Sequence, residues 1–151
     1  MCLKVDKQKT AKHSLIKTNK KMRFWKKFEL TREIGTLLTP YTCCTVKRSL
    51  DYIKPKSFSP QFSCEYFGTV MIEGGCIHAY CKKQERIASS KYIVIPIIVE
   101  SDDVIAFGQN LDVCFFKYKI SNKTWEHIEK LRTKFFFNIE NHMSNKRVCT
   151  W

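Results

Sequence analysis

The side chains best suited to chemistry lie around a pair of glycines in the middle of the chain. Gly74 and Gly75 precede Cys76 and His78, and Cys81 follows three residues later. Histidine titrates near neutral pH, so His78 could act as a general base or bind a phosphate, and a cysteine next to it could act as a nucleophile. Tyr41 is the other candidate for a catalytic group. The alternative is that His78 has a purely structural role, as a strand residue held by one hydrogen bond.

The same residues are the ones that a zinc site would use. Cys76, His78 and Cys81 carry soft ligand atoms, but positions 76 and 78 share one face of a strand while Cys81 points to the other. Structural zinc sites more often use two short ligand pairs. We therefore predict no metal, and we expect no cofactor.

Catalytic signatures are missing from the sequence. It contains no glycine-rich phosphate loop, no Gly-x-Ser-x-Gly elbow and no His-Glu-x-x-His pair. The sequence therefore does not favour an enzyme. The enzymatic alternative is a small enzyme acting on nucleotides or protein side chains, with a pocket lined by Tyr41, His78 and Tyr80.

The elements that would position these residues are mostly strands. In the segment 23–30, Phe24, Phe28 and Leu30 recur at period two, which indicates a half-buried strand. Further strands are predicted at 41–46, 64–72, 76–81, 92–99 and 111–120, with 64–72 and 76–81 forming a hairpin over the glycines. Pro96 indicates an edge strand or a bulge.

A helix follows the last strand. Ser121 or Asn122 can cap it, and apolar residues recur on one face at three- and four-residue spacing: Trp125, Ile128, Leu131, Phe135 and Ile139. We therefore predict an α+β fold, a small mainly antiparallel sheet with a C-terminal amphipathic helix packed on it. The expected organisation is a disordered basic arm over 1–22, one domain over 23–143 and a frayed tail over 144–151.

Positive charge is concentrated near the start of the chain. Residues 1–27 hold ten Lys and Arg against Asp6 alone, a net of +9 out of the formal +13. Lysines that neutralise phosphates release counterions, so such an arm can bind nucleic acid without sequence preference. The predicted contact residues are Lys12, Lys17, Lys20, Lys21, Arg23, Lys26 and Lys27. The alternative is a solubilising tail or a localisation signal.

Composition limits the class of protein. A chain of 151 residues suits one domain, and its longest apolar run, Tyr92 to Val99, is far shorter than the about 20 residues of a membrane span. The start of the chain has no apolar segment of the secretory type, so we expect an intracellular protein of the cytoplasm or nucleus, without membrane contact. In that setting its eight cysteines are expected to be reduced.

Several short motifs resemble small uncharacterised proteins of bacteriophages and other large DNA viruses. The motifs are Trp25-Lys26, Thr39-Pro40-Tyr41, Val46-Lys47, Gly75-Cys76-Ile77-His78-Ala79-Tyr80, Val94-Ile95-Pro96 and Asp103-Val104-Ile105-Ala106-Phe107-Gly108. Those proteins have a glycine directly before the Ile-His pair, where this chain has Cys76. The resemblance implies a viral or mobile-element setting and no activity. The expected function is thus an accessory binding module that contacts nucleic acid, with a protein–protein interaction domain as a further alternative.

Overall fold

The computed structural model describes residues 2–5, 21–40, 44–54, 61–63, 71–73, 77–83, 91–100 and 104–137. It is mostly antiparallel sheet followed by a helix, so the predicted α+β class is confirmed. The elements are β1 (Cys2–Lys4), β2 (Met22–Leu30), β3 (Thr36–Leu38), β4 (Thr45–Lys47), β5 (Gln61–Ser63), β6 (Met71–Glu73), β7 (Ile77–Tyr80), β8 (Tyr92–Val99), β9 (Val104–Phe107), β10 (Asp112–Phe115), α1 (Asn122–Arg132) and a π-helical turn (Thr133–Phe137).

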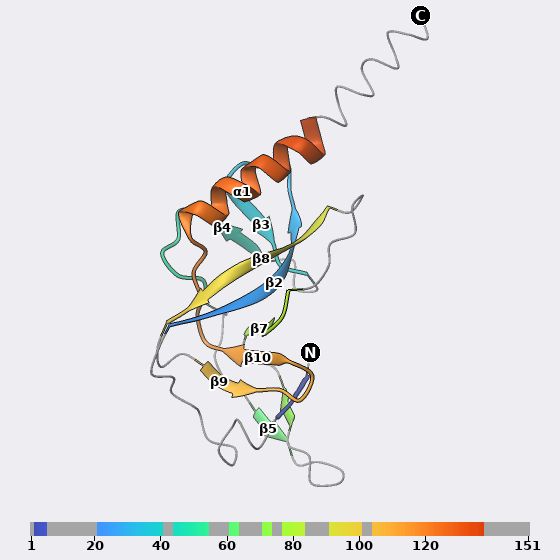
Figure 1. The fold of residues 1–151 in the computed structure, drawn as a ribbon, viewed down its shortest axis with the longest axis vertical. Coiled ribbons are helices and arrows are strands. Elements are labelled where there is room, and N and C mark those ends of the chain that lie inside the picture. Colours follow the sequence, from blue (N-terminus) through green and yellow to red (C-terminus); the bar gives the residue numbers. More distant parts are fainter. Residues whose placement is uncertain are drawn as a thin grey trace, which may run out of the picture.

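Strand β2 organises the main sheet. Seven strands pair in the order β4-β3-β2-β7-β10-β9, with β8 also paired to β2. β8 runs antiparallel along the whole of one edge of β2, from Met22 opposite Val99 to Glu29 opposite Tyr92, whereas β3 and β7 share its other edge. The long β2–β8 ribbon crosses the middle of the molecule, with α1 at one end and β5 at the other (Figure 1).

The chain beyond β10 returns to the far edge of β8. Ile98 and Lys119 exchange both backbone hydrogen bonds at 2.9 Å, and Tyr118 and Ile53 pair in the same way. These bridges connect β8, through residues 117–119, back to β10. Pro96, which has no N–H to donate, faces this sparsely bonded edge, in agreement with the edge position predicted for it.

The core lies on the inner face of the β2–β8 ribbon. Alternate residues of both strands are buried, as period two predicts for Phe24, Phe28 and Leu30. Phe24 stacks on Phe115 with ring centroids 6.2 Å apart. The main core cluster is formed by β2, β8, β10, Tyr118 and the helix, and it includes Phe24, Phe28, Leu30, Ile93, Ile95, Ile97, Val99, Val113, Phe115, Tyr118, Trp125 and Ile128.

Helix α1 begins where the sequence predicts. Ser121 is the N-cap, and its hydroxyl accepts a hydrogen bond from the backbone N–H of Thr124 at 3.2 Å. Trp125 and Ile128 are buried against the sheet, and Leu131 and Phe135 pack at the margin of the core. Ile139 lies outside the described residues.

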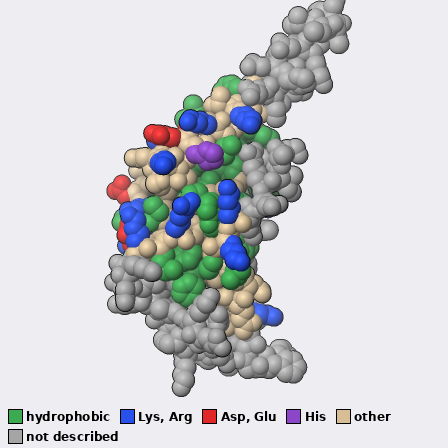
Figure 2. Space-filling view, viewed as in Figure 1, with side chains coloured by type: hydrophobic (Ala, Val, Ile, Leu, Met, Phe, Trp, Pro, Cys, Tyr) green, Lys and Arg blue, Asp and Glu red, His purple; other side chains and the backbone are tan. Residues whose placement is uncertain are grey.

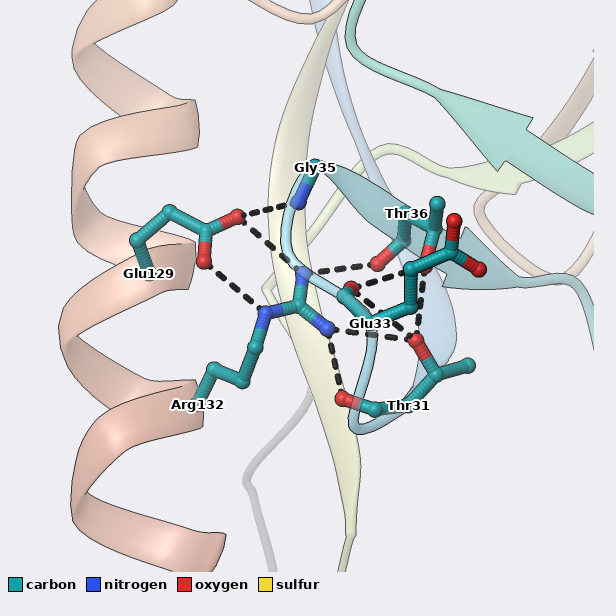
Figure 3. A network of polar contacts seen from close by, with 6 residues as sticks. All are labelled: Thr31, Glu33, Gly35, Thr36, Glu129 and Arg132. Carbon is teal, nitrogen blue, oxygen red and sulfur yellow. Dashed lines mark hydrogen bonds and ion pairs between the residues drawn. The ribbon is translucent and has the colours of Figure 1, made fainter. Parts of the chain in front are cut away.

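A buried arginine joins α1 to the turn between β2 and β3 (Figure 3). Arg132 is 1% exposed, and its guanidinium donates to the Glu129 carboxylate and to the backbone carbonyls of Thr31 and Thr36, at 2.6 to 3.2 Å. Glu129 also accepts the backbone N–H of Gly35 at 2.9 Å. The network holds the helix against a turn that is about 100 residues distant in the sequence.

The predicted disordered arm is wrong for its first residues. Residues 2–4 form β1, which pairs with β6, and Leu3 and Val5 are fully buried against Ala106 and Cys114. The alternation Leu3-Lys4-Val5 satisfies the strand period, which the surrounding charge obscures. Residues 6–20 lie outside the described residues and connect two strands, since Met22 already belongs to β2. The predicted tail, 144–151, also lies outside them.

The predicted hairpin over Gly74 and Gly75 is wrong as well. β6 pairs with β1 and β5, whereas β7 pairs with β2 and β10, so the two arms of the expected hairpin belong to different sheets. Local turn chemistry indicates that the chain can reverse, but long-range pairing with better apolar partners decides which strands meet.

Candidate nucleic-acid interface

The outer face of the main sheet carries a cluster of aromatic and basic side chains. Side chains directly opposite in an antiparallel pair project to the same face, so Trp25 lies beside Pro96 of β8 on one side and Tyr80 of β7 on the other. We define the basic–aromatic face by six residues: Arg23, Trp25, Lys27, Tyr80, Lys83 and Tyr92. Arg23, Lys27, Lys83 and Tyr92 are exposed, and Trp25 and Tyr80 are half-buried.

Three of the cations of this face lie over aromatic rings. The Arg23 guanidinium is 4.8 Å from the Trp25 ring centroid, and the Lys83 ammonium is 5.4 Å from the same ring. The Lys27 ammonium lies 4.7 Å from the ring of Tyr92. These distances are within the range of cation–π attraction, which holds the positive groups close to the sheet.

Two described carboxylates beside the β2–β8 ribbon form ion pairs with lysines outside the face. Glu29, which follows Lys27 on the outer face of β2, forms an ion pair of 2.6 Å with Lys91. Glu100 forms an ion pair of 2.5 Å with Lys119. Among the described residues, no carboxylate forms an ion pair with Arg23, Lys27 or Lys83. Within the described ranges, the positive charge of these three side chains is therefore not neutralised by an ion pair.

The basic surface continues past β8. Lys119 lies opposite Ile98 on the outer face, and strand alternation places Lys117 on that face too. The Lys117 ammonium is 4.8 Å from the ring of Tyr52, which is 38% exposed. The hydrogen bond from Lys119 lowers the pKa of Glu100, burial opposes this, and the charges of Lys119, Lys21 and Lys117 lower it further. These lysines therefore lie together at the start of β2, where the Lys-rich segment 6–20 ends.

Basic and hydrophobic side chains also lie next to one another in a space-filling view of one side of the molecule (Figure 2). In Figure 2, Lys and Arg side chains lie among hydrophobic ones over the region of β2 and β8, while Asp and Glu gather at the left edge of the view. A surface of this kind offers both positive charge and flat apolar area.

The predicted nucleic-acid residues divide into three groups. Arg23 and Lys27 lie on the basic–aromatic face, and Lys21 is exposed directly before β2. Lys12, Lys17 and Lys20 lie outside the described residues. Lys26 is the third case, because it does not reach the outer face.

The Lys26 side chain points inward, on the same face of β2 as Phe24 and Phe28. Its ammonium donates a hydrogen bond of 2.8 Å to the backbone carbonyl of His78 and lies 5.9 Å from the Phe28 ring. Burial lowers its pKa from 10.5 to about 8. Strand alternation turns Lys26 away from its neighbours Trp25 and Lys27, so its predicted contact with nucleic acid stays a prediction that the outer face does not share.

The predicted catalytic and metal candidates are only partly described. His78 is half-buried on β7, opposite the buried Cys114, and Tyr80 projects from the same face of the strand. Tyr41 and Cys76 lie outside the described residues, so the predicted pocket of Tyr41, His78 and Tyr80 stays a prediction. Cys81 is half-buried at the margin of the core.

Metal ligands do not gather in the part of the chain that is described. No group of three or more His, Cys, Asp or Glu side chains there is arranged to hold an ion. Cys44, Cys81 and Cys114 are present as thiols, and Cys114 is fully buried, as its position between Val113 and Phe115 predicts.

Trp25, Tyr92 and Lys83 are residues of the basic–aromatic face that the sequence analysis does not predict as contact residues. Trp25 and Lys27 alternate with the core residues of β2, so the period that predicts the core also places them outside. Tyr92 begins the apolar run Tyr92 to Val99, which indicates a strand but not an exposed ring. Lys83 follows β7, and its approach to Trp25 depends on the β2–β7 pairing, which no local pattern shows.

No model of a known protein family matches the chain, and comparisons with curated proteins and with solved structures gave no match. The resemblance to viral proteins therefore stays a prediction. Within the described ranges, no helix has the length and apolar character needed to cross a membrane.

Proposed function

We propose that this protein is a nucleic-acid-binding module whose folded domain contributes a binding surface of its own, the basic–aromatic face. The observation that carries the proposal is that Arg23, Lys27 and Lys83 are exposed on one sheet face and lie over aromatic rings instead of pairing with described carboxylates. Positive side chains at such a surface attract phosphates and gain free energy by releasing counterions.

The Lys-rich segment supports the same role. Residues 6–20 contain five lysines against Asp6, a net of +4, and they join the chain to β2 beside Lys21, Lys117 and Lys119. The segment and the face therefore meet at one end of β2. A shared phosphate track across both would raise affinity without sequence preference.

The proposal keeps the setting expected from the sequence, an accessory protein of a virus or mobile element acting inside a host cell. What supports it is the motif resemblance and the match between a basic surface and the nucleic acids of that setting. Among the described residues nothing favours the enzymatic alternative in the same way.

The test is a fluorescence-anisotropy titration with labelled oligonucleotides over a series of salt concentrations. The face variant is Arg23→Gln, Lys27→Gln, Lys83→Gln, and the segment variant replaces Lys7, Lys9, Lys12, Lys17 and Lys20 by Gln. Removing the whole segment 1–22 is unsuitable, because it would also remove the buried Leu3 and Val5. The matched control is Lys123→Gln, Lys130→Gln, Lys134→Gln, which removes the same charge from exposed positions around α1.

We expect the face variant to lose affinity steeply. For single strands, three lost phosphate contacts reduce the slope of log K against log salt by about 2. The α1 control should lose much less. Equal losses in the face variant and the control would show that only net charge matters and would contradict a defined surface, and absence of binding by the unmodified chain would overturn the proposed function.

A further inference from the structure

We infer that the ligand of the basic–aromatic face is a single-stranded nucleic acid whose bases stack on Trp25 and Tyr92. This inference rests on the proposed function and specifies its substrate class. It is drawn from the aromatic side chains of the face, whereas the proposed function is drawn from the cations.

The aromatic rings of the face are accessible in a way that core aromatics are not. Tyr92 is 36% exposed and Trp25 is half-buried, and they lie on β8 and β2, the two long strands of the sheet. The aromatic residues on the inner face of the same ribbon, Phe24 and Phe28, are almost fully buried. Large rings left at the surface of a sheet are suited to stack against another flat ring.

The sheet beside the two rings carries apolar side chains. Val94 projects outward from β8 between the rings, Pro96 lies beside Trp25 and Ile98 lies beyond it, and all three are half-buried. Trp25 is opposite Pro96 and Tyr92 is opposite Glu29, so the two rings are four residues apart along the ribbon, about 13 Å at the usual strand rise. An extended strand of nucleic acid can place separate bases on the two rings.

The cations are placed to serve the backbone of the same strand. Arg23 and Lys83 lie over the Trp25 ring and Lys27 lies over the Tyr92 ring, each within 5.4 Å of a ring centroid. A base that stacks on one ring takes the place of a cation there, and the displaced side chain remains close enough to pair with the phosphate of that nucleotide. The guanidinium of Arg23 can itself present a flat surface to a base.

A duplex fits this surface less well. Its bases are already stacked on one another, so their faces cannot reach Trp25 or Tyr92. Reading a duplex groove requires a protruding helix or a two-stranded ribbon. On the described surface the basic–aromatic face is carried by the sheet itself, and α1 mixes Lys123 and Lys130 with Glu126 on its exposed side.

The experiment compares single-stranded and duplex oligonucleotides of equal length, titrated against the full chain and four variants. Trp25→Leu and Tyr92→Leu remove the rings, whereas Trp25→Phe and Tyr92→Phe retain them. Each variant is first checked for the thermal transition of the unmodified protein. Tyr92 is the safer position if Trp25→Leu disturbs the fold, because its ring is exposed.

We expect tighter binding to the single strand than to the duplex. Each Leu variant should lose about tenfold in single-strand affinity with an unchanged salt slope, since stacking carries no charge. The Phe variants should retain most of the affinity, and duplex binding should change little in all four.

The outcomes separate the two claims. Equal affinity for both oligonucleotides, with no loss in the Leu variants but a clear loss in the face charge variant, would overturn the stacking inference and leave the proposed function standing. Unchanged binding in the face charge variant would overturn the proposed function. Binding to vesicles containing phosphatidylserine, with none to either oligonucleotide, would overturn both.

Discussion

Arg132 and Lys26 are two cations inside one fold, and they are accommodated in opposite ways. All five N–H donors of Arg132 have acceptors, supplied by Glu129, Thr31 and Thr36, and one of these acceptors is a carboxylate. The ammonium of Lys26 has a backbone carbonyl, that of His78, as its hydrogen-bond acceptor among the described residues. Because burial removes water from this ammonium and no carboxylate compensates among the described residues, the pKa of Lys26 is lowered.

The difference shows that burial of charge and stabilisation by charge are separate properties. On folding, the Arg132 guanidinium exchanges water for a complete set of hydrogen-bond acceptors. Replacing this side chain therefore leaves several of these acceptors without their donor. Lys26 gives up its hydration for one acceptor, so its removal relieves a cost. The two sites should therefore respond to the same kind of substitution, a cation replaced by methionine, with opposite signs.

The largest effect is expected from Arg132→Met. The change strands the Glu129 carboxylate and the carbonyls of Thr31 and Thr36, and removing one partner of a buried ion pair costs about 3–5 kcal/mol of unfolding free energy. Urea denaturation of both proteins measures this loss. Lys130→Met, on the exposed side of the same helix, is the control and should change stability by less than about 0.5 kcal/mol. A similar small change in Arg132→Met would contradict the role given to the network.

The next effect, of opposite sign, is expected from Lys26→Met. The unfolded lysine keeps its proton up to pH 10.5, whereas the folded one loses it at about pH 8. The unfolded state binds more protons between these values, so stability of the unmodified protein rises with pH across this window. At neutral pH the variant should be more stable by about 1–3 kcal/mol, at about 1.4 kcal/mol per pKa unit.

Stability measured as a function of pH tests this explanation. The gap between Lys26→Met and the unmodified protein should close as the pH rises from about 8 toward 10.5. Lys27→Met, one residue along on the exposed face, should leave stability unchanged at every pH. A gap that does not depend on pH would show that the gain comes from apolar packing and not from the buried charge.

These two cations also show what a sequence can and cannot predict. Local period-two alternation was sufficient to predict that β2 buries Phe24 and Phe28. It also places Lys26 on the same side, yet charge led to its prediction as an exposed contact. Arg132 follows Ile128 by four residues on the apolar face of α1, but its partners in the 31–36 turn lie about 100 residues away. Acceptors that arrive through long-range packing leave no mark in the sequence nearby.

The same limit applies to the candidate interface. Arg23 and Lys27 could be identified from charge density alone, and Trp25 from alternation. Lys83 approaches Trp25 because β7 pairs with β2, a long-range pairing that no local pattern shows. The residue that long-range pairing brings to the face, Lys83, is therefore less predictable than those that β2 itself supplies.

A smaller effect is expected from Glu129→Gln, which keeps the shape of the Arg132 network and removes one charge. Burial would raise the pKa of Glu129, but the hydrogen bonds from Arg132 and Gly35 and the positive charges nearby lower it below its ordinary value. The carboxylate therefore stabilises the fold above the unfolded pKa of 4.5, and this contribution is lost as the pH falls. We expect a loss of about 1–2 kcal/mol near neutral pH, measured by urea denaturation.

The pH dependence separates this charge effect from simple loss of a hydrogen bond. In strong acid both proteins carry a neutral group at position 129, so their stabilities should converge. Glu126→Gln, exposed on the same helix, is the control and should show no such dependence. A constant difference at all pH values would mean that the ionic part of the network contributes nothing.

The smallest effect is expected from Tyr118→Phe. Tyr118, like Lys26, buries a polar group with few hydrogen-bond partners, but its hydroxyl is neutral. The Tyr118 hydroxyl is buried and has no hydrogen-bond partner among the described residues, while its ring contacts Phe28 and Phe115, which a phenylalanine would retain. Removing an unsatisfied buried hydroxyl should change stability by less than about 1 kcal/mol, in the stabilising direction. Burial, with a smaller contribution from Cys44, raises the pKa of Tyr118, so the unmodified protein should lose stability above about pH 10, where the unfolded tyrosine ionises. The Tyr118→Phe variant should lack this loss of stability above pH 10. The control variant Tyr52→Phe, at an exposed ring, should show the same loss as the unmodified protein. Destabilisation by more than about 1 kcal/mol would show that the hydroxyl is hydrogen-bonded in solution. Of Arg132, Tyr118 and Lys26, only Lys26 would then be a buried polar group whose replacement stabilises the fold.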